Sequence, residues 1–199
     1  MRYLSLLASL ILFCSPDHLI RRSRDDYLPL QIDNSWTYVS GSESLFISVI
    51  DDTTIEDRGC FVIVLGPQYK YWNHSDDGIT EYSEFSVGPS GIEYDLEKRF
   101  YPKFPFPLVD GHTFADSFTH YEVIEGETTC FFHRISGVVH ILDNDRYCVV
   151  VDDSLDVDSN WLDTTYCFTE SYTLAPAIGI ETYKDRNGKT WDLESYSIK

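Results

Sequence analysis

The sequence predicts an all-β protein, an antiparallel meander that forms a barrel, a half-barrel or a sandwich. Three observations support this fold class: aromatic residues make up 15% of the chain, short apolar runs recur between turn residues, and the periodicity of an amphipathic helix is nearly absent. Aromatic and β-branched side chains pack well on a pleated surface. A chain of 199 residues fills one core of ordinary size, so a single domain is expected.

Alternating or continuous apolar runs mark the expected strands. They lie at residues 45–50, 60–65, 68–72, 80–87, 120–124, 130–135, 138–142 and 147–151. The segments between them are rich in Gly, Asn, Asp and Pro, which supply turn geometry. Near the end of the chain, Asn187-Gly188 predicts a hairpin that joins residues 179–183 to 191–198, because both residues tolerate positive φ. Only residues 94–100 have a pattern compatible with a helical turn.

An internal echo suggests that the domain contains two related β units. The octet from Pro29 to Trp36 matches the octet from Pro107 to Phe114 without a gap: Pro-Leu opens both and an aromatic residue ends both. Downstream, residues 49–65 parallel residues 135–151, each with a strand, an acidic turn, an Arg, and a Cys that opens an apolar strand. Two related units explain both matches, and chance similarity is the alternative.

The first residues predict export and a lipid anchor. Arg2 precedes a short apolar run at residues 4–13, which fits a secretory signal and falls short of the roughly 20 apolar residues of a membrane-spanning helix. Cys14 follows directly, as in bacterial lipoprotein signals, although Phe13 stands where such signals usually have Gly, Ala or Ser. We therefore expect a signal at 1–14 with lipidation of Cys14, a polar tether at 15–26 and the β domain at 27–199. The alternative is that the apolar run is an N-terminal strand or a buried helix end.

The charge of the chain excludes one class of partner. With 33 acidic and 15 basic residues, the formal net charge is −18. Such a surface repels phosphate backbones and anionic headgroups, so nucleic acid is not an expected partner. Solubility explains the acidic surface better than a dedicated cation-binding face does.

Four cysteines besides Cys14 are available for pairing: Cys60, Cys130, Cys148 and Cys167. An oxidising compartment could oxidise them, and Cys148 with Cys167 is the first expected pair because an acidic loop is expected to join their strands. Buried free thiols are the alternative. No C-x-x-C or Cys/His ligand spacing occurs, so a structural zinc site is not expected.

The acidic loop at residues 152–163 is the best candidate for a metal site. Asp156, Asp158 and Asn160 place oxygen ligands at alternating positions, as a compact calcium loop does. However, Trp161 stands where the calcium loop of an EF-hand needs Gly, and Cys167 stands where it needs a bidentate Glu. A solvated acidic loop is therefore the favoured interpretation, calcium is the minority hypothesis, and no other cofactor is expected.

The opening and closing motifs resemble a family of uncharacterised bacterial exported proteins and lipoproteins. Its opening pattern, Tyr-x-Pro-Leu-x-x-Gly-Asn-x-Trp-x-Tyr, is matched by Tyr27, Pro29, Leu30, Asn34, Trp36 and Tyr38, with Asp33 in place of Gly. Later matches are Pro107, Leu108, Gly111 and Phe114, then Tyr147-Cys148, and finally the closing segment 174–198 with Ala177 where Gly is common. The resemblance spans most of residues 27–198. It implies fold and export, and it carries no catalytic residues.

The search for chemistry gives few candidates. The chain has no Gly-x-Ser-x-Gly elbow, phosphate-binding glycine loop or His-Glu-x-x-His helix. The six histidines are scattered, and those at 133 and 140 are interpreted as core or edge residues of apolar strands. Asn34, Trp36 and Tyr38 are likewise interpreted as turn and core residues.

The function expected from the sequence is therefore that of an exported, lipid-anchored, non-catalytic β protein that binds a protein or small-molecule partner at the cell envelope. Two alternatives stay open. One is a calyx-like carrier of a small apolar ligand, because residues 33–38 faintly resemble the Gly-x-Trp opening of lipocalins. The other is a hydrolase that uses an acidic cluster, for which two carboxylates with a raised pKa would have to face one pocket.

Overall fold

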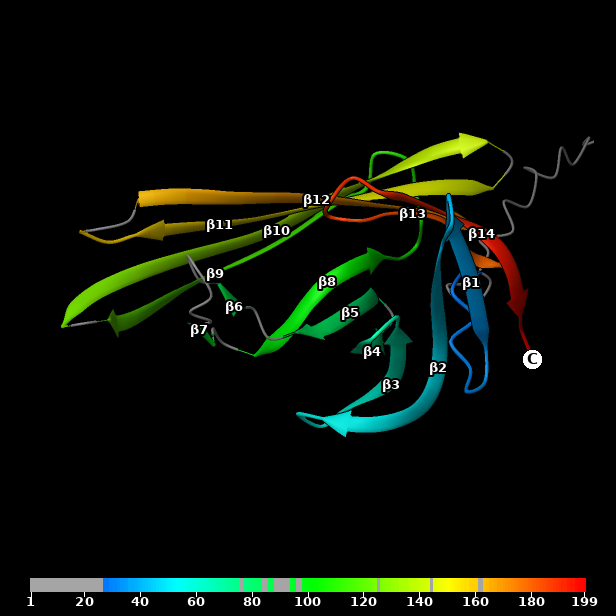
Figure 1. The fold of residues 1–199 in the computed structure, drawn as a ribbon, viewed down its shortest axis with the longest axis horizontal. Helices are drawn as coiled ribbons and strands as arrows, with labels where there is room; N and C mark the ends of the chain where they lie inside the picture. Colours follow the sequence, from blue (N-terminus) through cyan, green and yellow to red (C-terminus); the bar gives the residue numbers. More distant parts are fainter. Residues whose placement is uncertain are drawn as a thin grey trace, which may run out of the picture.

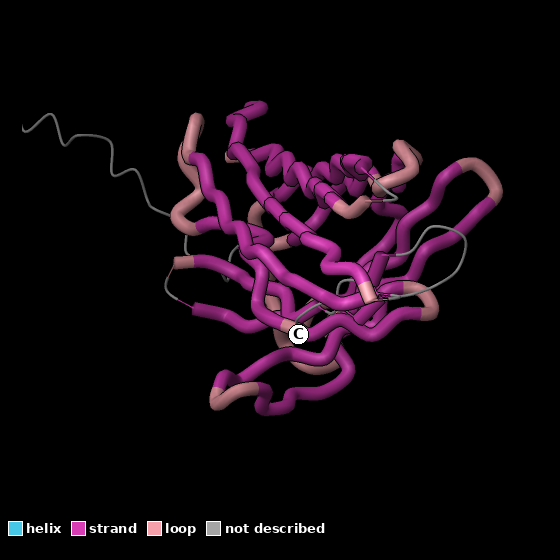
Figure 2. Tube along the Cα trace, turned by 90° about the vertical axis from the view of Figure 1, so that its left-hand side faces the viewer, coloured by secondary structure: helices cyan, strands magenta, loops and turns pink. Residues whose placement is uncertain are grey.

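The fold is all-β, as the sequence predicts. A computed structural model describes residues 27–75, 77–83, 86–87, 94–95, 98–124, 126–143, 145–160 and 163–199. Within these ranges the secondary-structure elements are strands (Figure 2). Their bounds are β1 (Ser35–Ser40), β2 (Glu43–Ile55), β3 (Arg58–Leu65), β4 (Gln68–Ser75), β5 (Gly78–Ser83), β6 (Ser86–Val87), β7 (Tyr94–Asp95), β8 (Arg99–Pro105), β9 (Thr113–Ile124), β10 (Glu127–Asp143), β11 (Arg146–Asp158), β12 (Asp163–Ala175), β13 (Gly179–Lys184) and β14 (Thr190–Ser197).

Twelve of the strands form one antiparallel sheet. Its order is β8-β5-β4-β3-β2-β1-β14-β13-β12-β11-β10-β9, and β6 pairs with β7 separately. Each unit is a meander, and the two units join where β1 pairs with β14. Because β8 leads directly into β9 along the chain, the order is that of an up-and-down barrel whose remaining edges are β8 and β9. The sheet is thus a nearly closed barrel (Figures 1 and 2).

Side chains hold the two edge strands together along the seam between β8 and β9. The Arg99 guanidinium donates to the Asp116 carboxylate at 2.8 Å. The rings of Tyr101 and Phe118 lie 6.0 Å apart, and the guanidinium lies over both rings. In the described part of the chain, β8 and β9 thus meet through side chains and not through a backbone ladder.

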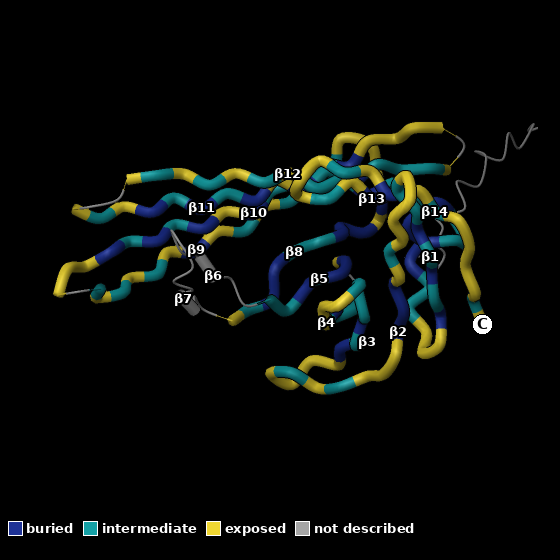
Figure 3. Tube along the Cα trace, viewed as in Figure 1, coloured by how far each residue is buried: buried dark blue, intermediate teal, exposed yellow. Residues whose placement is uncertain are grey.

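The core lies between the two halves of the barrel, and the long strands β9–β12 continue past it as an arm (Figures 1 and 3). Trp36 and Tyr38 are buried; Trp36 donates a hydrogen bond to the carbonyl of Ile178, directly before β13, and Tyr38 donates to the carbonyl of Ile180 in β13. Asn34 has no exposed surface. The interpretation of these three residues as turn and core residues is confirmed. A smaller cluster around Phe131 and Leu155 stabilises the arm.

The turn that precedes β1 has a defined pattern of hydrogen bonds. Asp33 has a φ of 77°, its N–H donates to the carbonyl of Val49 at 2.8 Å, and the N–H of Val49 donates to the carbonyl of Asn34 at 2.9 Å. The amide of Asn34 donates to the carbonyl of Pro29 at 2.6 Å. Positive φ is tolerated by Asp because its short polar side chain can hydrogen-bond locally.

The turn that precedes β9 repeats this pattern at the positions that the echo predicts. Gly111 has a φ of 75°, its N–H donates to the carbonyl of Val139 at 2.9 Å, and the N–H of Val139 donates to the carbonyl of His112 at 2.9 Å. The ring of His112 lies 3.2 Å from the carbonyl of Pro107. Equivalent contacts occur in both turns, so the two related units are present in the fold.

The downstream match also holds, with a corrected alignment. The hairpins β2–β3 and β10–β11 both turn at an Asp with positive φ, Asp57 and Asp145, directly before the Arg. The turn contacts above make Val49 equivalent to Val139. The β2–β3 hairpin is two residues longer between this point and its Arg.

Several strand predictions need correction. Residues 130–135 and 138–142 belong to one strand, β10, because Gly137 continues the ladder opposite Phe114. The expected helical turn at 94–100 is wrong where it is described: Tyr94–Asp95 is β7 and Arg99 opens β8. The acidic loop at 152–163 is largely strand, since β11 continues to Asp158.

Asn34 should be essential to the first turn. Replacing Asn34 by alanine removes the bond to Pro29 and the bond that its side-chain oxygen accepts from the N–H of Lys199 at 2.9 Å. We expect a loss of about 1–3 kcal/mol in the free energy of unfolding, measured by urea denaturation. His112→Asn transfers the first turn's residue into the second turn and should change stability by less than about 0.5 kcal/mol. Equal losses in the two variants would contradict the equivalence of the turns.

Candidate functional site

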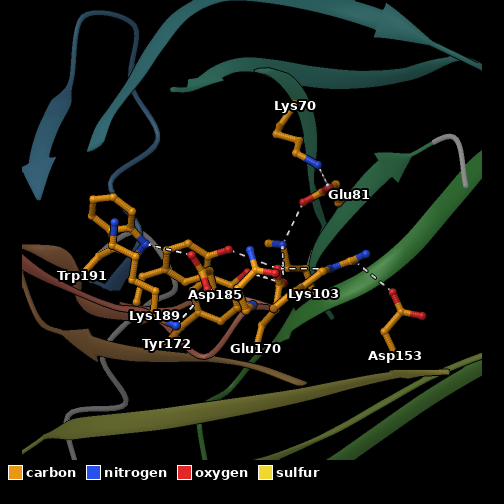
Figure 4. Close-up of polar contacts among 12 residues, drawn as sticks. Lys70, Glu81, Lys103, Asp153, Glu170, Tyr172, Asp185, Lys189 and Trp191 are labelled. Atoms are coloured by element: carbon orange, nitrogen blue, oxygen red, sulfur yellow. Dashed lines mark hydrogen bonds and ion pairs between the residues drawn. The ribbon is translucent and has the colours of Figure 1, made fainter. Parts of the chain in front are cut away.

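Charged side chains and a histidine from both units meet inside the barrel behind the seam. They lie on β4, β5 and β8 of the first unit, on β10, β11 and β12 of the second, and in the β13–β14 turn. The members are Lys70, Glu81, Lys103, His133, Asp153, Glu170 and Arg186. Figure 4 labels Lys70, Glu81, Lys103, Asp153 and Glu170. We call this set the ion network.

Glu81 is the centre of the network on the first unit. Its carboxylate accepts hydrogen bonds from Lys70 at 3.0 Å and from the indole of Trp72 at 3.0 Å, and lies 2.9 Å from the ammonium of Lys103. Burial raises the pKa of Glu81, but the attraction of Lys103 and Lys70 outweighs it, so the pKa lies well below its ordinary value. Burial lowers the pKa of Lys103, and the carboxylates of Glu81 and Glu170 together raise it above its ordinary value. Both partners are therefore ionised at neutral pH.

Glu170 is the corresponding centre on the second unit. One carboxylate oxygen accepts a hydrogen bond from the hydroxyl of Tyr172 at 2.7 Å, and the other accepts from Tyr183 at 3.1 Å and from Arg186 at 3.3 Å. Lys103 reaches across from the first unit, with its ammonium 3.8 Å from Glu170. Burial raises the pKa of Glu170, but the attraction of Lys103 and Arg186 outweighs this effect, so the pKa lies below its ordinary value.

Asp153 completes the network beside a buried histidine. Its carboxylate contacts the ring of His133 at 2.6 Å and accepts a hydrogen bond from Arg186 at 2.9 Å. The ring of His133 has no exposed surface and lies edge-on to Tyr101 and Phe118, each with its centroid 5.1 Å away. The interpretation of His133 as a core histidine is correct, and the ring also connects the ion network to the seam.

The ion network faces a cleft that opens beside the seam. Its lining combines the members of the network other than Lys70 with Ser83, Tyr101, Pro102, Ile135 and Val151. The enclosed volume is about 50 Å³, which is room for a few water molecules or for one polar functional group. A whole drug-sized ligand does not fit inside. The cleft can therefore receive a group such as an amine, a carboxylate or a diol from a molecule that rests at its mouth.

The residues predicted for calcium lie at the end of β11 and directly beyond it. Asp156 and Asp158 extend from the same side of β11, and Asp156 accepts a hydrogen bond from the hydroxyl of Thr165 at 2.7 Å. Asn160 follows the end of this strand. Among the described residues, no three His, Cys, Asp or Glu side chains gather in a way that could hold a metal ion. Because Asn160 is not one of these residue types, the calcium hypothesis stays a prediction.

The predicted disulfide does not form in this structure. Cys148 lies opposite Thr173 and Cys167 lies opposite Ser154 on the paired strands β11 and β12. Six register positions separate the two cysteines, which is roughly 20 Å along a strand. All four cysteines of the β domain are free. The alternative of free thiols fits this arrangement, and Cys60 is the buried one.

The predicted signal, the lipidation site Cys14 and the tether at 15–26 lie outside the described residues. Within the described ranges, no helix is long and apolar enough to cross a membrane.

Sequence reasoning missed most members of the ion network. Carboxylates are abundant, with 33 in the chain, so nothing local distinguishes Glu81 or Glu170 from the others. One signal was available: Glu170 and Tyr172 share a strand face by alternation, as do Asp153 and Leu155. A carboxylate on the apolar face of a strand predicts a buried partner.

Comparisons with known proteins add no residue and no chemistry to this site. No family model matches the chain, and no curated protein matches it. Among solved structures, the chain is similar to a protein from Bacteroides fragilis that is described as exported and as having a YmcC-like fold. The sequence identity is 14%, the TM-score is 0.34, and the match covers 86% of this chain and 98% of that one.

Acid should weaken the fold through the carboxylates of the network. The folded-state pKa of Glu81 and of Glu170 is lowered, so their stabilisation is present above the unfolded value of about 4.3 and is lost as the pH falls through the folded value. The free energy of unfolding should therefore fall below about pH 4.5. Glu81→Gln should reduce this fall, whereas the exposed control Glu43→Gln should not. Urea denaturation at several pH values measures this pH dependence. If the free energy of unfolding falls equally with pH in Glu81→Gln and Glu43→Gln, the prediction is wrong.

Proposed function

We propose that this chain is an exported, lipid-anchored, non-catalytic β protein that binds a partner or ligand at the cell envelope, with a polar group of that molecule entering the seam cleft. The observation that carries the proposal is the cleft itself, where cations, carboxylates and the ring of Tyr101 converge from both units around one opening. Convergent polar groups beside apolar walls are typical of ligand sites. Arg2, the apolar run and Cys14 support the export and the anchor.

The direction of the pKa shifts supports binding over hydrolysis. A hydrolase with two carboxylates needs one with a raised pKa to act as the proton donor. Glu81 and Glu170 both line the cleft, and the pKa of each is lowered by its cationic neighbours. The acidic cluster is therefore better suited to fixed electrostatic recognition.

The packing of the interior gives no support to a calyx-like carrier. Between Trp36, Tyr38, Trp72 and neighbouring aliphatic side chains the free space is about 10 Å³, and beside Tyr172 and Tyr183 it is about 20 Å³. Each is room for one or two water molecules. An apolar ligand would need a cavity many times larger.

The proposal can be tested on protein released gently from the membranes of its native host. Native mass spectrometry should show a bound species of defined mass, and Arg186→Gln should reduce its occupancy at least tenfold, because Arg186 lies at the mouth and contacts Asp153. Arg146→Gln, which removes a surface contact to Glu181, is the matched control and should keep the species. Cys14→Ser should move the protein from the membrane fraction to the soluble one. An unliganded wild-type protein, or a Cys14→Ser variant that stays in the membrane fraction, would contradict the proposal.

A further inference from the structure

Apolar side chains are exposed at one end of the barrel, around the β10–β11 turn. Ile141 and Leu142 at the end of β10 are 52% and 51% exposed, and Val109 in the loop before β9 is 50% exposed. The register of the ladder shifts between Ile141 and Asp143, so Leu142 is an extra residue of β10. The side chains of Ile141 and Leu142 both reach solvent. The carboxylate of Asp110 accepts a hydrogen bond from the N–H of Ile141 at 2.9 Å, which fixes the loop against the turn. We call Val109, Ile141 and Leu142 the apolar rim.

The rim lies where the described chain begins. Tyr147 pairs with Ile141 in the β10–β11 ladder, and its ring packs edge-on against Tyr27 with the centroids 5.6 Å apart. Tyr27 is the first described residue. The turn between β10 and β11 and the C terminus lie toward the same end of the molecule (Figure 1). A chain that reaches Tyr27 from an anchor at Cys14 therefore arrives beside the apolar rim.

The length of the tether limits which surface can meet the membrane. Twelve residues, 15–26, separate Cys14 from Tyr27, and even fully extended they span only about 40 Å. The 17 residues of β10 run from the far end of the arm to the rim, a distance of roughly 55 Å. If the far end of the arm touched the membrane with the arm upright, Tyr27 would lie farther from the membrane than the extended tether can reach. The rim has no such restriction.

We infer that the apolar rim rests in the interface of a zwitterionic phospholipid membrane and orients the barrel on it. This inference builds on the lipid anchor of the proposed function. Asp110, Asp143 and Asp145 flank the rim, so an anionic headgroup would be repelled, whereas a zwitterionic one is not. The lipid at Cys14 holds the chain at the membrane, and the rim adds a second contact that fixes the orientation of the barrel. The seam cleft then has a fixed orientation relative to the membrane surface.

Photo-crosslinking in vesicles tests this orientation. The full-length membrane form is reconstituted into vesicles of phosphatidylcholine and phosphatidylethanolamine, with Leu142 replaced by benzoylphenylalanine. The matched control places the same residue at Val123, which is 69% exposed at the far end of β9. Mass spectrometry measures lipid adducts, and it also reports whether the N-terminal peptide carries a lipid at Cys14. We expect at least fivefold more lipid adduct at Leu142 than at Val123.

The outcomes separate this inference from the proposed anchor. If Cys14 carries lipid and the adduct yields at Leu142 and Val123 are equal, the orientation by the rim is wrong while the anchor stands. If Cys14 carries no lipid, the proposed anchor is wrong. Binding of the same chain to vesicles then tests whether the rim contacts the membrane. Binding that falls at least fivefold in Ile141→Asp supports the rim, and binding that is absent or unchanged in this variant overturns it.

Discussion

Replacing Lys103 by methionine should cost the protein about 3 kcal/mol of unfolding free energy, the lower end of the range for a broken buried ion pair. Methionine keeps the apolar stem of the side chain and removes the ammonium, which lies over the ring of Tyr172 at 5.1 Å from its centroid. The loss therefore reports the ammonium, which contacts Glu81 at 2.9 Å and Glu170 at 3.8 Å. Without the ammonium, the carboxylates of Glu81 and Glu170 repel each other in the barrel interior. Urea denaturation measures the effect, and the midpoint of thermal unfolding should fall by about 6–12 °C.

A matched surface variant controls for the loss of charge alone. Lys199→Met removes an ammonium that pairs with Asp33, and both of these side chains are more than half exposed. Exposed pairs contribute at most about 1 kcal/mol. Adding Glu81→Gln to Lys103→Met should recover part of the lost stability, because one unpaired carboxylate is removed. If Lys103→Met is as stable as Lys199→Met, the ion network does not hold the two units together.

Replacing Gly78 by alanine should be about as damaging, with a loss of about 3 kcal/mol or more from backbone strain and overpacking combined. Gly78 has a φ of 146°, which L side chains rarely adopt. A Cβ at this position would lie 2.2 Å from the carbonyl oxygen of Phe104 and 3.1 Å from the Cα of Pro105. Because both neighbours are backbone atoms of the paired strand β8, the clash forces the edge of the sheet to move.

Gly59→Ala is the natural control for this effect. Gly59 lies near the start of β3 with ordinary φ, and a Cβ added there would have no atom within 4 Å. Its replacement should change stability by less than about 0.5 kcal/mol, or raise it slightly because alanine restricts the unfolded chain. Urea denaturation and the yield of folded protein measure both variants. Similar stabilities for Gly78→Ala and Gly59→Ala would show that β5 and β8 are not packed as closely as described.

Lys103→Met and Gly78→Ala both affect the position of the edge strand β8. Gly78 allows β8 to pair closely with β5, and Lys103 on β8 reaches across to Glu170 of the second unit. Together with the contact between Arg99 and Asp116, they determine where the edge strand β8 lies. The cleft depends on that position, since Tyr101, Pro102 and Lys103 of β8 are part of its lining.

The sequence by itself determined the features that depend on local patterns: the fold class, the strands and the two related units. Alternation and turn residues predicted the strands and the all-β class, because side chains on a strand alternate between two faces. The echo predicted two units, and the positive φ of Asp33 and Gly111 shows why: both turns require the same backbone geometry. The burial of Trp36 and Tyr38 followed from their position at the start of a strand.

Only the tertiary structure decided which charged residues form a site and which cysteines lie apart. The pairs of the ion network join strands that are distant in sequence, as Lys103 and Glu170 do across the barrel. No local pattern encodes such a contact, because it depends on the curvature of the sheet and on the register of all the strands between. The same register separates Cys148 from Cys167. Local propensity fixes the strands, whereas long-range closure of the sheet creates the cleft.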